Sequence, residues 1–171
     1  MRRLLAIACL MAAAAPAQAE VVSSAANGFH IRRTVTVPVG PDSAFAAFAN
    51  VGRWWNPQHS YGGVASRLTM ELRPGGCFCE RLIGGGIEHL RVTYVDRPKR
   101  LLLTGGLGPL LFQAVSGVMD LKFEAAGTGT KVTMDYKVAG FANGGADKIA
   151  APVDKVLGEQ MSRYAASVTA K

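Results

Sequence analysis

The sequence predicts an α+β domain in which a curved antiparallel sheet of about six or seven strands surrounds one long C-terminal helix, with two short helices after the first strand. Two patterns predict this arrangement. Through most of the chain, short runs of alternating apolar and polar residues are separated by glycine and proline clusters, as in strands and hairpins. Near the C-terminus, apolar residues instead recur every three or four positions, as on one face of a helix. A length of 171 residues suits one domain.

The N-terminal segment has the features of a secretory signal peptide. Arg2 and Arg3 precede an apolar run, and small residues at alternate positions follow it, ending at Ala19. The run is shorter than the ~20 apolar residues that cross a bilayer. We therefore expect residues 1–19 to be removed, residues 20–28 to form a disordered linker and residues 29–171 to form the domain. The expected location is periplasmic or secreted, without stable membrane insertion.

The first elements of the domain follow in order. Residues 29–38 are expected to form a strand, because apolar side chains alternate through this segment until a proline ends it. A short amphipathic helix is expected around Phe45 and Phe48, after a turn that can cap it. A second short helical turn is expected to carry Trp54 and Trp55.

The remaining elements are a meander of strands and the terminal helix. The expected strands span residues 68–72, 77–83, 88–95, 100–107, 115–125 and 130–139. Glycine clusters and a proline separate several of them and supply the backbone conformations that turns need. The terminal helix is expected over residues 149–168, with Pro152 either beginning it or kinking it because proline lacks a backbone donor.

Charge and motifs exclude several classes of function. The net charge of +7 falls to about +5 once the two arginines of the signal peptide are removed, and the basic residues are scattered without interleaved aromatic residues. We therefore expect no nucleic-acid partner. The sequence has no Gly-x-Ser-x-Gly nucleophile motif, phosphate-binding loop or dinucleotide fingerprint, so no cofactor is expected.

Several segments together resemble the START-like (SRPBCC) superfamily, and are most similar to its polyketide-cyclase-like and heat-shock-ATPase-activator-like branch. They are the strand ending in Val37-Pro38, the helix 45–48, the Trp54-Trp55 pair, the turn 95–101 and the closing helix. Residues 54–63 and 75–80 also resemble an exported subgroup of this superfamily. The resemblance covers residues 29–169. It implies a helix-grip fold, with a cavity between sheet and helix for lipids, polyketides, hormones or other apolar ligands.

Ligand-binding residues are expected in the tryptophan loop and on the strand that follows it. In a helix-grip fold the loop would lie near the cavity mouth, where aromatic rings offer apolar faces with a polar edge. At least one tryptophan is expected to be core only, and His59 either contacts the ligand or lies in solvent. The expected ligand-binding residues are Trp54, Trp55, His59, Tyr61, Phe78 and Glu80.

Glu80 could also carry acid/base chemistry. It alternates with Phe78, so both side chains are expected to face the cavity, and the next strand could bring His89 or Arg91 beside Glu80. Glu80 and His89 would then form a general acid/base pair for cyclisation or aldol chemistry, with Arg91 polarising a carbonyl group. The alternative is an internal ion pair between Glu80 and Arg91, which we favour because it satisfies a buried charge without any chemistry.

Cys77 and Cys79 lie two positions apart on one expected strand. In a regular strand their Cα atoms would be separated by ~6.6 Å, at the far edge of disulfide geometry. Free thiols are therefore favoured, and a disulfide is expected only if the strand bulges. A metal site is not expected, because the three histidines, His30, His59 and His89, have no ligand-like spacing.

Three functions fit these observations. The first is an exported binding protein that holds a small apolar molecule. The second is a cofactor-free cyclase or aldolase that uses Glu80, His89 and Arg91. The third is a protein-interaction module like the heat-shock-ATPase activators, which would need a contiguous apolar surface patch.

Overall fold

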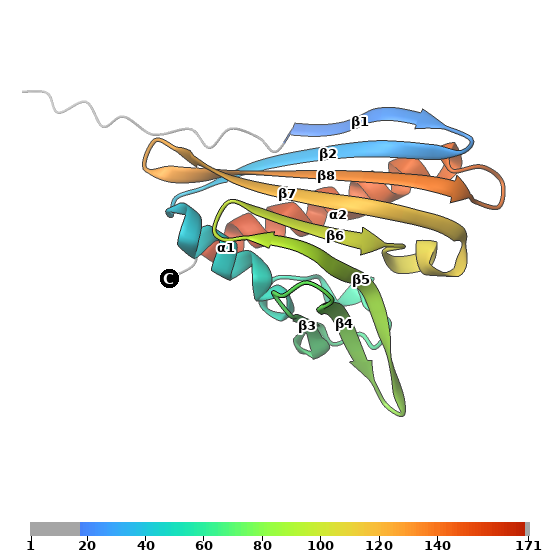
Figure 1. Ribbon diagram of the computed structural model, residues 1–171, viewed down its shortest axis with the longest axis horizontal. Helices are drawn as coiled ribbons and strands as arrows, with labels where there is room; N and C mark the ends of the chain where they lie inside the picture. Colours follow the sequence, from blue (N-terminus) through green and yellow to red (C-terminus); the bar gives the residue numbers. More distant parts are fainter. Residues whose placement is uncertain (1–17, 170–171) are drawn as a thin grey trace, which may run out of the picture.

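The computed structural model describes residues 18–169, which form one antiparallel sheet with a long helix along one of its faces (Figure 1). The sheet has eight strands in the order β1-β2-β8-β7-β6-β5-β4-β3. This confirms the α+β helix-grip fold, with more strands than the six or seven predicted. The strands are β1 (Gln18–Ala25), β2 (Gly28–Val37), β3 (Leu68–Met70), β4 (Cys77–Leu82), β5 (Gly85–Asp96), β6 (Arg100–Gly105), β7 (Ala114–Ala126) and β8 (Gly129–Phe141).

The additional strand is β1, which corrects the prediction of a linker over residues 20–28. It pairs antiparallel with β2, where Val21 lies opposite Ile31. The prediction failed because an edge strand can be mostly polar: it has a pairing partner on one side only, and its exposed residues need no apolar partner. The expected signal peptide lies outside the described residues, except for its last two positions, which belong to β1.

The segment after β2 contains α1 (Pro41–Ala49) and three short 3₁₀ turns. Proline at the start of α1 suits a position whose backbone donor has no helical partner, and Phe45 and Phe48 are buried. The turns are η1 (Val51–Arg53), η2 (Pro57–His59) and η3 (Ala65–Arg67). Trp54 and Trp55 lie between η1 and η2, and not within the single helical turn that was expected.

The long helix α2 (Asp147–Thr169) contacts β2 and β1. Pro152 lies inside it, so the proline does not begin the helix. An ion pair fastens the helix to the sheet: Nε of Arg33 on β2 donates to Oδ1 of Asp154 at 2.8 Å. No helix within residues 18–169 is both long and apolar enough to cross a membrane.

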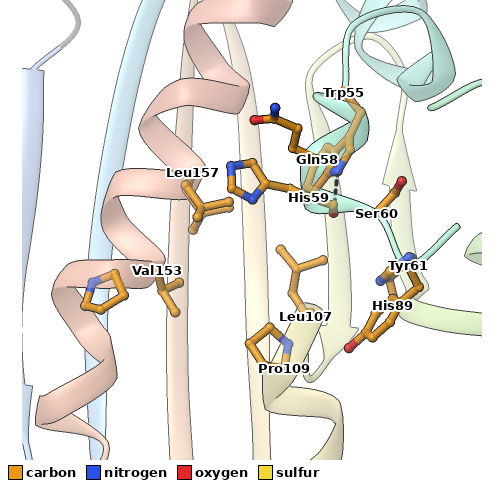
Figure 2. A pocket seen from close by; sticks show the side chains of 13 residues that line it. Trp55, Gln58, His59, Ser60, Tyr61, His89, Leu107, Pro109, Val153 and Leu157 are labelled. Atoms are coloured by element: carbon orange, nitrogen blue, oxygen red, sulfur yellow. Dashed lines mark hydrogen bonds between the residues drawn. The ribbon is translucent and has the colours of Figure 1, made fainter. Parts of the chain in front are cut away.

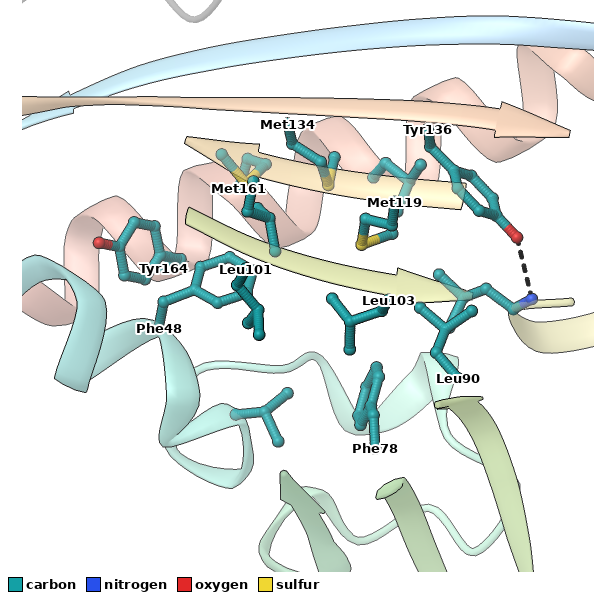
Figure 3. Packing of buried hydrophobic residues seen from close by; sticks show 14 of the residues in the cluster. Phe48, Phe78, Leu90, Leu101, Leu103, Met119, Met134, Tyr136, Met161 and Tyr164 are labelled. Atoms are coloured by element: carbon teal, nitrogen blue, oxygen red, sulfur yellow. Dashed lines mark hydrogen bonds between the residues drawn. The ribbon is translucent and has the colours of Figure 1, made fainter. Parts of the chain in front are cut away.

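The core fills the space between α2, α1 and the sheet (Figure 3). Met119 of β7, Met134 of β8 and Met161 of α2 belong to this core, together with Phe48 of α1 and Tyr164 of α2. The Tyr136 hydroxyl donates to the Gly105 carbonyl and accepts from the Leu107 amide, both at 3.1 Å, and burial raises the pKa of Tyr136 to about 12. Gly117 lies against this ring, and a Cβ atom there would approach it to 2.5 Å. These bonds fix the end of β6 and the loop that follows, which forms one wall of the pocket described next.

Candidate functional site

A pocket of about 370 Å³ lies between α2, the loop 55–61 and the loop after β6, which contains η4 (Gly108–Phe112). Figure 2 shows Val153 and Leu157 on the helix, Leu107 and Pro109 on the η4 loop, and Tyr61 beside His89. A second hollow, of about 450 Å³, lies along β1 and the start of β2, at one edge of the sheet. The first pocket is the candidate site, because apolar side chains from three elements converge on it. Its full lining is Trp55, Gln58, His59, Ser60, Tyr61, His89, Leu107, Gly108, Pro109, Pro152, Val153, Val156 and Leu157.

Hydrogen bonds hold the loop 55–61 against α2. Within the loop, Nε1 of Trp55 donates to the His59 carbonyl at 2.9 Å (Figure 2). The backbone amide of Asn56 donates to Oε1 of Gln160 at 2.9 Å, and the Asn56 side chain donates to Glu159. The Asn56 bond is also the main cause that lowers the pKa of the Glu159 carboxyl. These bonds fix the position of the loop relative to α2, so the loop forms one wall of the pocket.

Glu80 lies behind this wall. Its side chain is fully buried, and its two carboxylate oxygens accept the backbone amides of Tyr61 at 2.9 Å and Gly62 at 2.6 Å. A third bond, of 3.2 Å, joins Oε2 to Nε2 of His89. Glu80 does not line the pocket, but it connects strand β4 to the loop and to β5. The carboxylate thus positions both Tyr61 and His89.

His89 is the polar residue of the pocket wall that is most deeply buried, with 3% of its surface exposed. Its ring stacks on Tyr61, with centroids 5.9 Å apart, and packs against Phe78 at 5.2 Å. Burial lowers the pKa of His89, and the bond to Glu80 offsets this only in part, so the imidazole is neutral at neutral pH. Its Nδ1 atom is buried and has no hydrogen-bond partner among residues 18–169.

Some of the residues that were predicted to bind the ligand line the pocket, and others lie in the core. Trp55, His59 and Tyr61 line the pocket. Trp54 and Phe78 instead line a core cavity of about 20 Å³, where Nε1 of Trp54 donates to the Phe48 carbonyl at 3.1 Å.

Arg91 lies away from the pocket. It is exposed and pairs with Glu88 at 2.5 Å, so the favoured ion pair of Glu80 with Arg91 does not form. The reason is a bulge in β5, where His89 is an extra residue: Phe78 lies opposite Leu90, but Cys79 lies opposite Glu88. Both His89 and Leu90 therefore face inward, and Arg91 faces outward.

The two cysteines lie on β4, the strand opposite this bulge. Cys77 and Cys79 form a disulfide, with Cα atoms 5.3 Å apart, closer than in a regular strand. This corrects the expectation of free thiols. The bulge that was expected to be needed lies on the neighbouring strand β5, and not on the strand that carries the cysteines. Among the described residues, no group of three or more His, Cys, Asp or Glu side chains is placed to hold a metal ion.

Sequence analysis missed the wall formed by the η4 loop. The strand expected over residues 100–107 ends at Gly105, and Leu107, Gly108 and Pro109 turn into the pocket. The close spacing of three glycines and a proline in residues 105–109 was the available signal, because such residues interrupt strands.

No protein-family model matches the sequence, and no curated protein matches it. Solved structures do share its fold. CalU16 from Micromonospora echinospora has a TM-score of 0.61 at 11% identity, over 91% of this chain and 88% of that chain. Mll3558 from Rhizobium loti has a TM-score of 0.59 at 20% identity, over 82% and 98%. DynU16, from the dynemicin biosynthetic locus, has a TM-score of 0.59 at 18% identity, over 82% of this chain and 47% of its own. The chain is therefore similar to these proteins in its helix-grip fold.

Proposed function

We propose that this protein is an exported binding protein of the START-like type, which holds a small, largely apolar molecule in the pocket between α2 and the loop 55–61. The observation that carries the proposal is the pocket itself. Its volume of about 370 Å³ lies within the usual range for small-molecule sites, and apolar side chains form most of its wall. A few polar groups, among them His59, Tyr61 and His89, are placed to orient a ligand.

Two further observations support parts of the proposal. Disulfides persist in oxidising compartments, so the bond between Cys77 and Cys79 supports export. The fold is shared with DynU16, which comes from the dynemicin biosynthetic locus, and this supports a small organic molecule as the ligand.

The pocket can be tested by filling it. Val156 lines it from α2, so Val156→Trp places a large ring in the ligand space. We expect the apolar fluorescent probe N-phenyl-1-naphthylamine to bind the wild-type protein, and its affinity to fall by at least about tenfold in the variant, a loss of ~1.4 kcal/mol or more. Fluorescence titration measures both affinities.

The matched control is Ala166→Trp, which adds the same ring to an exposed position of the same helix. This variant should bind the probe as the wild type does. Circular dichroism should show both variants folded. Equal loss of binding in both variants, or no binding by the wild type, would contradict the proposal.

One observation favours a second candidate, a cofactor-free enzyme. Glu80 and His89 are in contact at 3.2 Å, and His89 reaches the pocket wall, as acid/base chemistry requires. In this alternative His89 removes and returns a proton on the bound molecule, and Glu80 orients the ring. The predicted carbonyl-polarising role of Arg91 has no support, because Arg91 lies outside the pocket. Conversion of the natural ligand by the wild type, and its loss in Glu80→Gln and His89→Ala, would favour the enzyme over the carrier.

A further inference from the structure

A small apolar cavity lies behind the pocket. It is the core cavity of about 20 Å³, which has room for about one water molecule. Its lining residues are apolar apart from Gln160, so they offer few polar partners to a water molecule, which needs two to four. Voids of this size are few in close-packed cores. An apolar space at this position can take part of an apolar ligand.

Two side chains separate the core cavity from the pocket. Trp55 and Leu157 line both spaces. Trp55 is held in place, because its Nε1 atom donates to the His59 carbonyl at 2.9 Å and its ring packs against Phe78, with centroids 5.5 Å apart. Leu157 reaches from α2 toward the pocket, and its aliphatic side chain makes no hydrogen bond (Figure 2). A change of rotamer at Leu157 is therefore the simplest movement that would join the two spaces.

Methionines surround the core cavity. The chain has six methionines, and those within residues 18–169 all line this cavity: Met70 on β3, Met119 on β7, Met134 on β8 and Met161 on α2 (Figure 3 shows the last three). Methionine is unbranched and has three rotatable bonds, so it packs around groups of different shape, whereas leucine, isoleucine and valine have well-defined rotamers. The cavity therefore lies in the part of the core that is best able to enlarge.

We propose that the pocket and the core cavity form one binding site, in which an unbranched alkyl chain of the ligand passes Leu157 and ends among the four methionines. The inference rests on the proposed function, and it narrows the ligand class from small apolar molecules in general to molecules with an alkyl chain. The polar end of such a molecule stays in the pocket near His59 and Tyr61. Each methylene group that leaves water for the cavity strengthens binding about fourfold. A compact ring system is too wide to pass Leu157.

Two alcohols test the requirement for a chain. 1-Undecanol and 1-adamantanemethanol have the same number of carbon atoms and one primary hydroxyl group, but the carbons of the second form a rigid cage. Displacement of N-phenyl-1-naphthylamine measures how tightly each alcohol binds the pocket. In protein labelled with ¹³C at the methionine methyl groups, we expect undecanol to shift the methionine resonances, and its terminal methyl group to show nuclear Overhauser contacts with them. Adamantanemethanol should leave these resonances nearly unchanged.

This measurement uses the wild-type protein, and its outcomes separate the inference from the proposed function. If undecanol displaces the probe without contacting the methionine methyl groups, or if adamantanemethanol shifts their resonances equally, the inference is overturned but the apolar pocket stands. If neither alcohol displaces the probe, the proposed function fails as well.

Met161→Phe should weaken binding of the chain. Met161 lines the core cavity and not the pocket, so a phenylalanine ring there fills the cavity and leaves the pocket wall unchanged. We expect the preference for undecanol over adamantanemethanol to fall by about tenfold or more, as for the exclusion of about two methylene groups.

The matched control is Leu121→Phe, which adds a ring at a fully buried position that lines neither space. This variant should keep the wild-type preference for undecanol. A preference that survives in Met161→Phe, or that is lost equally in both variants, would overturn the inference.

Discussion

Glu80→Leu is expected to destabilise the protein by at least about 3 kcal/mol. The substitution leaves the amides of Tyr61 and Gly62 without their acceptor, and it removes the hydrogen-bond partner of Nε2 of His89. An unpaired buried donor costs about 1–3 kcal/mol, and leucine has nothing to offer in exchange. Denaturant unfolding measures the loss as a lower transition midpoint with an unchanged slope.

Glu88→Leu is the control for this prediction. It is the same substitution on the neighbouring strand, but Glu88 is exposed and pairs with the exposed Arg91. Surface pairs of this kind contribute less than about 1 kcal/mol, so the control should unfold close to the wild type. If Glu80→Leu were as stable as Glu88→Leu, Glu80 would not hold the pocket wall as described.

Phe48→Ala is expected to cost about 3–5 kcal/mol, as for other buried aromatic residues. Its ring joins three elements: it lies 5.1 Å from Trp54, 5.8 Å from Phe123 and 5.2 Å from Tyr164, measured between ring centroids. Removing the Phe48 ring would leave a cavity where α1, α2 and the sheet meet, because the surrounding side chains are closely packed and can move into the empty space only in part.

The free energy of unfolding, measured by denaturant titration, tests this prediction as well. Phe141→Ala removes the same ring from an exposed position and should change stability by less than about 0.5 kcal/mol. A loss below about 1 kcal/mol in Phe48→Ala would show that this junction is not a centre of the core.

The sheet and the long helix could be predicted from the sequence, because a strand or helix that buries one face carries apolar residues at a regular spacing. Ile31, Val35 and Val37 are buried as expected from their alternation. The edge strand β1 was missed because its exposed residues carry no such pattern.

The candidate site was less predictable, because it depends on one irregularity and on two loops. The bulge in β5 sets which of His89 and Arg91 faces inward, and no local pattern in residues 88–92 marks it. The sequence placed aromatic residues of the loop 55–61 near the pocket, but only the folded chain shows that Trp55 lines both the pocket and the core cavity, whereas Trp54 lines the core cavity and not the pocket. The contact of Glu80 with His89 was one of two alternatives, and their positions in the sequence could not decide between them.

The most direct test of the central claim is native mass spectrometry of the protein isolated from its own host, followed by denaturation to release and identify any bound molecule. The account predicts a one-to-one complex with an apolar compound in the wild type and in Ala166→Trp, and its absence in Val156→Trp. A wild-type protein that carries no compound, or a compound that remains bound when Val156→Trp fills the pocket, would contradict the claim that this pocket holds the ligand.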